Sequence, residues 1–95
     1  MEGDFQTGQL VLSLAGRDAG RHFLVLKLDG QRVVVADGEL RKVARPKCKN
    51  RRHLYPYHVV DEDAVRRLDG GEPLRDAEIK AILVGLLEKG GRESE

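Results

Sequence analysis

Short apolar runs separated by glycine-containing turns are the feature that most restricts how the first half of this chain can fold. Asp29-Gly30 and Asp37-Gly38 each directly follow such a run. Asp-Gly is typical of two-residue hairpin turns, because type I′ turns need positive φ at both central residues. Runs of this kind, recurring at intervals of about ten residues, favour a small antiparallel barrel.

Alternating apolar residues and β-branched residues predict the strands themselves. We expect strands at residues 10–14, 22–28, 32–36, 39–43 and 52–59. Pro56 weakens the last of these, because proline has no amide hydrogen for the sheet ladder. The strand at 22–28 is apolar on both faces, so something must cover the face that does not line the barrel. A helix of the same chain or a second copy of the chain would satisfy this need.

The spacing of apolar residues becomes helical in the second half of the chain. Asp61 is a candidate N-cap of a short helix that the glycines at 70–71 would end. Asp76 is the expected N-cap of a longer helix that runs to about Lys89 and stops at the glycines at 90–91. Its apolar residues share one face at helical spacing: Ile79, Ile82, Leu83, Leu86 and Leu87. The fold class predicted is mainly β with C-terminal α.

Charge divides the chain where the periodicity changes. The net charge of the 95 residues is +1, but residues 1–53 hold eleven Lys/Arg against six Asp/Glu, and residues 54–95 hold six against ten. We therefore expect a β-barrel over residues 1–58 and an acidic helical extension over residues 59–95, docked on the barrel. The lone Cys48, the polar start and the lack of a long apolar run predict a cytoplasmic protein that does not enter a membrane.

The segment "LAGRDAGRH" carries two glycines four residues apart, Gly16 and Gly20. A phosphate-binding P-loop is excluded because no Lys-Ser/Thr follows Gly20. A dinucleotide fingerprint is excluded because the next segment reads as a strand, and a membrane-helix contact because Arg17 and Asp18 lie between the glycines. The remaining interpretation is a turn between two strands, shaped by positive φ at both glycines.

The stretch "GQLVLSLAGRDAGRHFLVL" resembles the KOW motif, and "DGQRVVVADGELRKVARPKCKNRRHL" extends the likeness. Together they resemble the large-subunit ribosomal protein fourteen family of eukaryotes and archaea, and its short bacterial KOW-domain relatives, over about residues 6–55. The resemblance implies an SH3-like barrel that binds ribosomal RNA or a ribosome-associated particle. The acidic helical extension departs from the eukaryotic ribosomal proteins.

Residues 41–52, "RKVARPKCKNRR", contain seven Lys/Arg and no acid. Such a run attracts phosphates, although it could also be a solvated connection. With the glycine loop it gives nine candidate RNA-binding residues: Arg17, Arg21, Arg41, Lys42, Arg45, Lys47, Lys49, Arg51 and Arg52. Because exposed aromatics are few, we expect phosphate and shape recognition of structured RNA. Tyr55 and Tyr57 either pack against the barrel or stack on a base.

The sequence contains no arrangement typical of catalysis. Cys48 lies among cations but lacks an organised base, and His22, His53 and His58 lack zinc-ligand spacing. We expect a non-enzyme with no metal, cofactor or small-molecule substrate. The alternative function is a protein-interaction module that docks on a ribosomal or transcription-machinery partner. A third possibility is that the acidic extension covers the basic surface and regulates RNA access.

Overall fold

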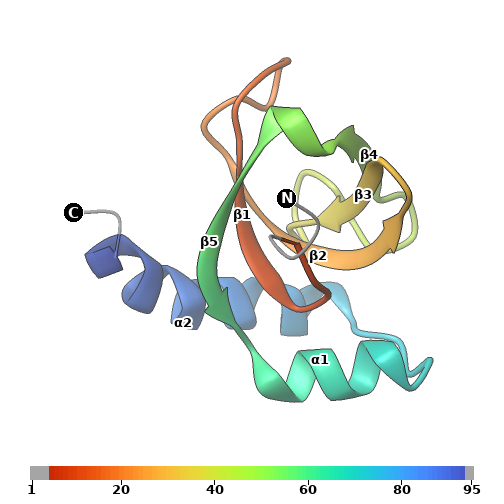
Figure 1. The fold of residues 1–95 in the computed structure, drawn as a ribbon. Coiled ribbons are helices and arrows are strands. Elements are labelled where there is room, and N and C mark those ends of the chain that lie inside the picture. The colour runs from red at the N-terminus through yellow and green to blue at the C-terminus, as the bar shows by residue number, and fades with distance from the viewer. Residues whose placement is uncertain (1–4, 94–95) are drawn as a thin grey trace.

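The computed structural model describes residues 5–93, with side chains described for residues 5–90. Five strands precede two helices (Figure 1): β1 Gln9–Ser13, β2 His22–Asp29, β3 Arg32–Ala36, β4 Lys47–Asn50, β5 Leu54–Val60, α1 Glu62–Asp69 and α2 Asp76–Glu93. A single turn of 3-10 helix, η2 Arg51–His53, joins β4 to β5. The predicted class, mainly β with C-terminal helices, is confirmed.

All strands belong to one antiparallel sheet in the order β4-β3-β2-β1-β5. The predicted hairpin between β2 and β3 turns at Gly30, whose φ is 61°. Pro56 lies on β5, which among the described strands pairs with β1 alone and is therefore an edge strand, where a missing amide is tolerated. This small curved sheet is consistent with an SH3-like barrel.

The predicted strand at residues 39–43 is wrong. The Asp37 carboxylate accepts hydrogen bonds from the amides of Glu39, at 3.0 Å, and Arg41, at 2.8 Å, and this closes the chain into a loop. Further along, the Val43 amide donates to the carboxylate of Asp76 at the start of α2, at 2.7 Å. Side chains therefore satisfy the amides that a strand ladder would have used. The fourth strand is β4, inside the segment that the sequence marked only as basic.

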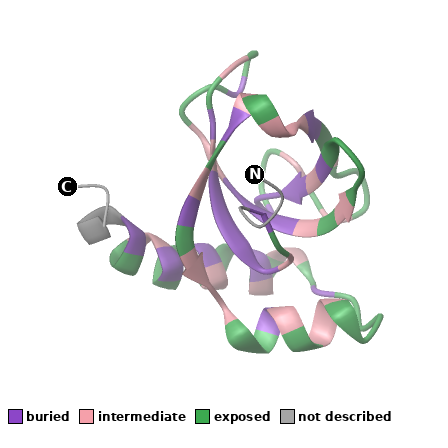
Figure 2. Cartoon of the chain, in the orientation of Figure 1, coloured by how far each residue is buried: buried purple, intermediate pink, exposed green. Residues whose placement is uncertain are grey.

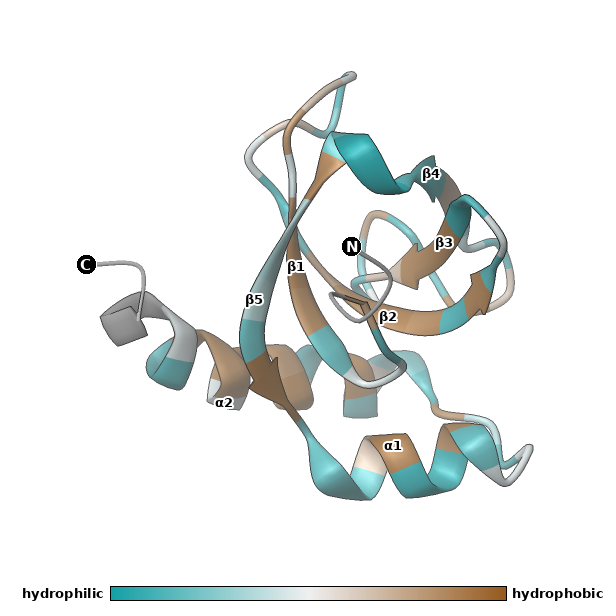
Figure 3. Cartoon of the chain, in the orientation of Figure 1, coloured by the Kyte–Doolittle hydropathy of each residue, from teal (hydrophilic) through white to brown (hydrophobic). Residues whose placement is uncertain are grey.

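Buried and apolar residues run along β1, β2 and β3 (Figures 2 and 3), and they form two clusters, one on each face of the sheet. One cluster fills the barrel interior: Phe5, Val11, Phe23, Val25, Val33, Val35 and Leu54. The other lies between the sheet and the helices: Leu10, Leu24, Ala36, Tyr57, Ala64, Leu74, Ile79, Leu83 and Leu86. Alternate residues of β2 thus point into different clusters, and α2 covers the outer face of β1, β2 and β5.

The two helices begin differently. The Asp61 carboxylate accepts from the Ala64 amide at 2.9 Å, so the predicted N-cap of α1 is confirmed. Asp76 is already the first residue of α2 and contacts Val43 instead of capping its own helix. The predicted stop at the 90–91 glycines is also wrong, since α2 continues to Glu93.

Gly90 explains why α2 continues beyond the predicted stop. A Cβ there would lie 2.8 Å from Cδ2 of Leu10 and 3.4 Å from Cδ1 of Tyr57. The missing side chain therefore lets α2 approach the sheet closely, and packing outweighs the low helix propensity of glycine. Within residues 5–93, no helix is both long and apolar enough to cross a membrane.

Candidate nucleic-acid interface

The glycine loop joins β1 to β2 at one end of the sheet. Gly16 has φ of 86° and Gly20 has φ of 90°, a left-handed conformation that glycine adopts without strain. The loop is closed by a hydrogen bond from the Gly20 amide to the Ser13 carbonyl at 2.8 Å. Arg17, between the glycines, is exposed.

A buried ion pair fastens this loop to β4. Lys49 Nζ lies 2.8 Å from Asp18 Oδ1 and donates to the Ala15 carbonyl at 2.8 Å, and each charged side chain is only 6% exposed. Burial opposes ionisation of Asp18, but hydrogen bonds from Lys49 and the Ser13 hydroxyl hold its pKa below the ordinary value. Lys49 is thus engaged inside the protein and is not an open contact for a phosphate.

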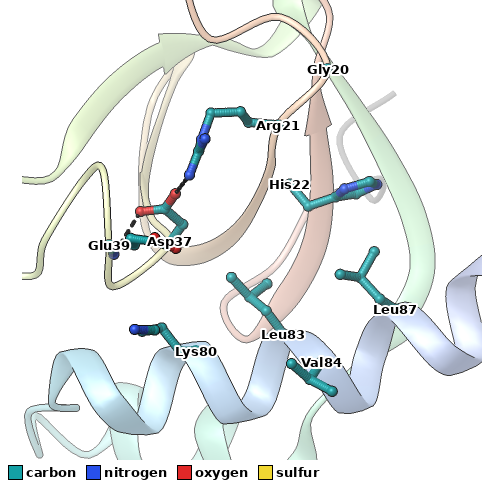
Figure 4. Close-up of a pocket in the computed structure, with 9 residues that line it drawn as sticks. All are labelled: Gly20, Arg21, His22, Asp37, Glu39, Lys80, Leu83, Val84 and Leu87. Carbon is teal, nitrogen blue, oxygen red and sulfur yellow. Dashed lines mark hydrogen bonds and ion pairs between the residues drawn. The ribbon is translucent and has the colours of Figure 1, made fainter.

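Arg21 makes the second ion pair of the region. Its Nη2 lies 2.7 Å from Asp37 Oδ2, and the Asp37 side chain is 6% exposed. Burial raises the pKa of Asp37, but Arg21 and the amides of Arg41 and Glu39 together hold this pKa below its usual value. The pair borders a pocket of about 400 Å³ between the sheet and α2, whose other walls include Lys80 and Leu83 (Figure 4). Arg21 therefore faces the α2 side of the molecule.

Three other predicted cations converge on one pocket of about 580 Å³. Arg17 comes from the glycine loop, Arg41 from the loop after β3, and Lys47 from the start of β4. Leu40, also exposed, and Asp18 complete the lining. Because Asp18 is paired with Lys49, the pocket presents an excess of positive charge.

Two further pockets continue this surface along β4 and η2. The second has a volume of about 350 Å³ and shares Lys47 with the first, and the third, of about 480 Å³, shares Asn50 and Arg52 with the second. We name the lining of the three pockets the basic band. Its cations are Arg17, Arg32, Arg41, Lys47, Lys49, Arg51 and Arg52, and its acid is Asp18.

The basic band is separated from the acidic helices. Figure 1 shows β4 and η2 on the side of the sheet away from α1 and α2, and Figure 3 shows both elements as hydrophilic. Among the described side chains, the ion pairs of the helical part join Arg66 to Asp63, and Arg67 to Glu72 and Glu78. Arg67 and the Arg75 amide lower the pKa of Glu78 to about 2. None of these acids pairs with a cation of the band.

Six of the nine predicted residues line the basic band, and three do not. The band contains Arg17, Arg41, Lys47, Arg51 and Arg52, and also the buried Lys49, whereas Arg21, Lys42 and Arg45 line none of its pockets. Lys42 and Arg45 are exposed in the loop before β4. Arg32 was missed because it lies outside the basic run; the β3–β4 register places it opposite Asn50.

The aromatic residues of β5 are divided between core and surface. Tyr57 is buried and contacts His22 through its hydroxyl, at 3.2 Å from Nε2. Tyr55 is 41% exposed and packs edge-on against Tyr57, with ring centroids 5.0 Å apart. Cys48 is exposed on β4. The part of the chain that the structure describes contains no group of three or more His, Cys, Asp or Glu that could hold a metal ion.

No protein-family model matches this chain, and a search of the curated proteins found no match. The likeness to KOW proteins therefore remains a resemblance carried by the motifs in residues 6–55.

Proposed function

We propose that this chain is a non-catalytic RNA-binding protein whose basic band holds the phosphate backbone of structured RNA. The observation that carries the proposal is that three pockets adjoin one another. Their cations come from five segments, namely the glycine loop, β3, the loop after β3, β4 and η2, and their one acid is neutralised by Lys49. The resemblance to KOW ribosomal proteins supports ribosomal RNA or a ribosome-associated particle as the target. We place the protein in the cytoplasm and propose no cofactor.

Most cations of the basic band are available to the phosphates of a ligand, because they form no ion pair with a described carboxylate of this chain. Within the described residues, Arg17, Arg32, Arg41, Lys47 and Arg52 have no ion pair. Each cation that meets a phosphate releases condensed counterions, so binding weakens as salt rises. Phosphate contacts fix the position of the protein on RNA without specifying sequence.

Fluorescence anisotropy with a labelled RNA hairpin at several salt concentrations tests the proposal. If about five cations contact phosphates, log K falls against log salt with a slope of roughly −4. Lys47→Glu should weaken binding and reduce the slope by about 1, because Lys47 lines two of the three pockets. Lys27→Glu is the matched control, since Lys27 is exposed on β2 and outside the band. A flat salt dependence would contradict RNA binding by this surface.

Sedimentation of cell extract through sucrose gradients tests the ribosomal target. We expect the protein to migrate with the large ribosomal subunit at low salt and to be released at high salt. Migration as free protein at both salt concentrations would contradict a ribosomal target, even if the protein binds RNA hairpins.

A protein-interaction module is the second candidate function, and the pocket beside α2 favours it. Val84, which lines this pocket with Leu83 and Leu87, is 60% exposed (Figure 4). A ribosomal or transcription-machinery protein docked there would bury this apolar surface. Association that survives ribonuclease treatment and is lost in Val84→Glu would support this function over RNA binding.

A further inference from the structure

The third pocket of the basic band differs chemically from the other two. It is lined by Phe5, Gln31, Asn50, Arg51, Arg52, Leu54 and Pro56. Three of these residues are apolar and two are neutral amides. A phosphate needs cations and amide donors, and gains nothing from an apolar wall. The lining therefore indicates a ligand group that has both apolar faces and a polar edge.

Arg51 is held as a fixed flat group in this pocket. Its Nε donates to the Gly30 carbonyl at 3.0 Å, and its backbone amide donates to the Gln31 carbonyl at 3.1 Å. The guanidinium carbon lies 5.3 Å from the centroid of the Phe5 ring. Nη1 is buried and has no hydrogen-bond partner among the described residues. Guanidinium planes are stacking surfaces for unstacked RNA bases, so Arg51 supplies a preorganised platform.

The two amides supply the hydrogen-bonding edge. Asn50 Oδ1 accepts from the Arg52 amide at 3.1 Å, which orients the side chain and leaves its NH₂ group for a ligand. Gln31 is exposed in the β2–β3 turn and offers both a donor and an acceptor. Paired donors and acceptors of this kind are what the edge of a nucleobase meets in protein–nucleic acid complexes.

We propose that this pocket holds one unpaired nucleobase of the RNA whose backbone lies on the basic band. Its volume of about 480 Å³ admits a group of this size. Arg52, shared with the neighbouring pocket, contacts the adjoining phosphate. The inference rests on the proposed function and adds base recognition to a surface that otherwise reads only phosphates.

Two RNA hairpins that differ at one bulged nucleotide test the inference. One carries a bulged adenosine and the other an abasic residue at the same position, so both have the same number of phosphates. The wild-type protein should bind the adenosine hairpin about tenfold more tightly, the range that stacking of one base provides. Gln31→Ala should reduce this preference to about threefold, because it removes one hydrogen-bonding side chain and leaves the stacking surface of Arg51 in place.

Gln6→Ala is the matched control, because Gln6 is also exposed and lines no part of the pocket. Equal, salt-dependent binding of both hairpins would overturn the base pocket and leave phosphate binding standing. A preference for adenosine that is undiminished in Gln31→Ala would also overturn it. Absence of binding to either hairpin at low salt would overturn the proposed function itself.

Discussion

Lys49→Met removes the cation of the buried pair that joins the glycine loop to β4. Both charged side chains are 6% exposed, and the variant leaves Asp18 with the Ser13 hydroxyl as its remaining side-chain donor among the described residues. Removing one partner of a buried pair costs about 3–5 kcal/mol, because the other charge stays desolvated and unpaired. With a urea m value of about 1.5 kcal/mol/M, a loss of 3 kcal/mol lowers the unfolding midpoint by about 2 M.

The pH dependence of this loss is a second readout. In the wild type the pKa of Asp18 is below its ordinary value of 3.8, so its contribution to stability is present above that pH and is lost as pH falls through the folded-state pKa. Without Lys49, burial raises the pKa, so protonation then favours the folded variant. The difference in unfolding free energy between the wild type and Lys49→Met should therefore become smaller as the pH falls from 7 to 3.

The matched control is Lys42→Met, which removes an exposed lysine that has no ion pair among the described residues. It should change the free energy of unfolding by less than about 0.5 kcal/mol. Asp18→Asn combined with Lys49→Met should lose less than Lys49→Met alone, because no charge is left buried. Equal urea midpoints for Lys49→Met and Lys42→Met would refute the reasoning.

Three further perturbations test other parts of the fold. Gly38→Ala should lower the free energy of unfolding, measured in urea, by at least about 2 kcal/mol, because the new Cβ overlaps the Asp76 carbonyl. Gly71 has the same φ of 80° but open space around it, so Gly71→Ala should cost about 1 kcal/mol. Equal losses of unfolding free energy in the two variants would contradict the close approach of Gly38 to α2. Burial lowers the pKa of His22, so the melting temperature should fall as pH drops below about 6.5, and His22→Gln should flatten this dependence. Asp61→Ala should cost about 1 kcal/mol of unfolding free energy by removing the cap of α1, and a loss below 0.3 kcal/mol would contradict that role.

Local patterns were enough to predict most of the elements. The Asp-Gly pair at 29–30 and the apolar alternation on either side of it produced the β2–β3 hairpin where expected. Asp61 was recognisable as a cap because its partner, Ala64, is three residues away. These features depend on contacts within a few residues, which a sequence displays directly.

Features decided by distant contacts could not be predicted in this way. The loop at 39–43 is closed by the nearby Asp37, but its last amide, that of Val43, donates to the distant Asp76. The continuation of α2 through Gly90 depends on the shape of the sheet beneath it. Lys49 appeared as one cation of a basic run, yet it points inward to Asp18, 31 residues earlier. The third pocket was hidden because Phe5, Gln31 and Arg51 are far apart in sequence.

The charged residues of β4 have a second consequence, because β4 is an edge of the sheet. Unpaired amides and carbonyls at an edge can recruit a strand from another molecule. β4 is only four residues long and carries Lys47 on its first residue, while the opposite edge, β5, carries Pro56. Both edges therefore discourage strand addition. A substitution that neutralises Lys47 removes a barrier to self-association together with one cation of the basic band, so light scattering belongs beside every binding measurement on such a variant.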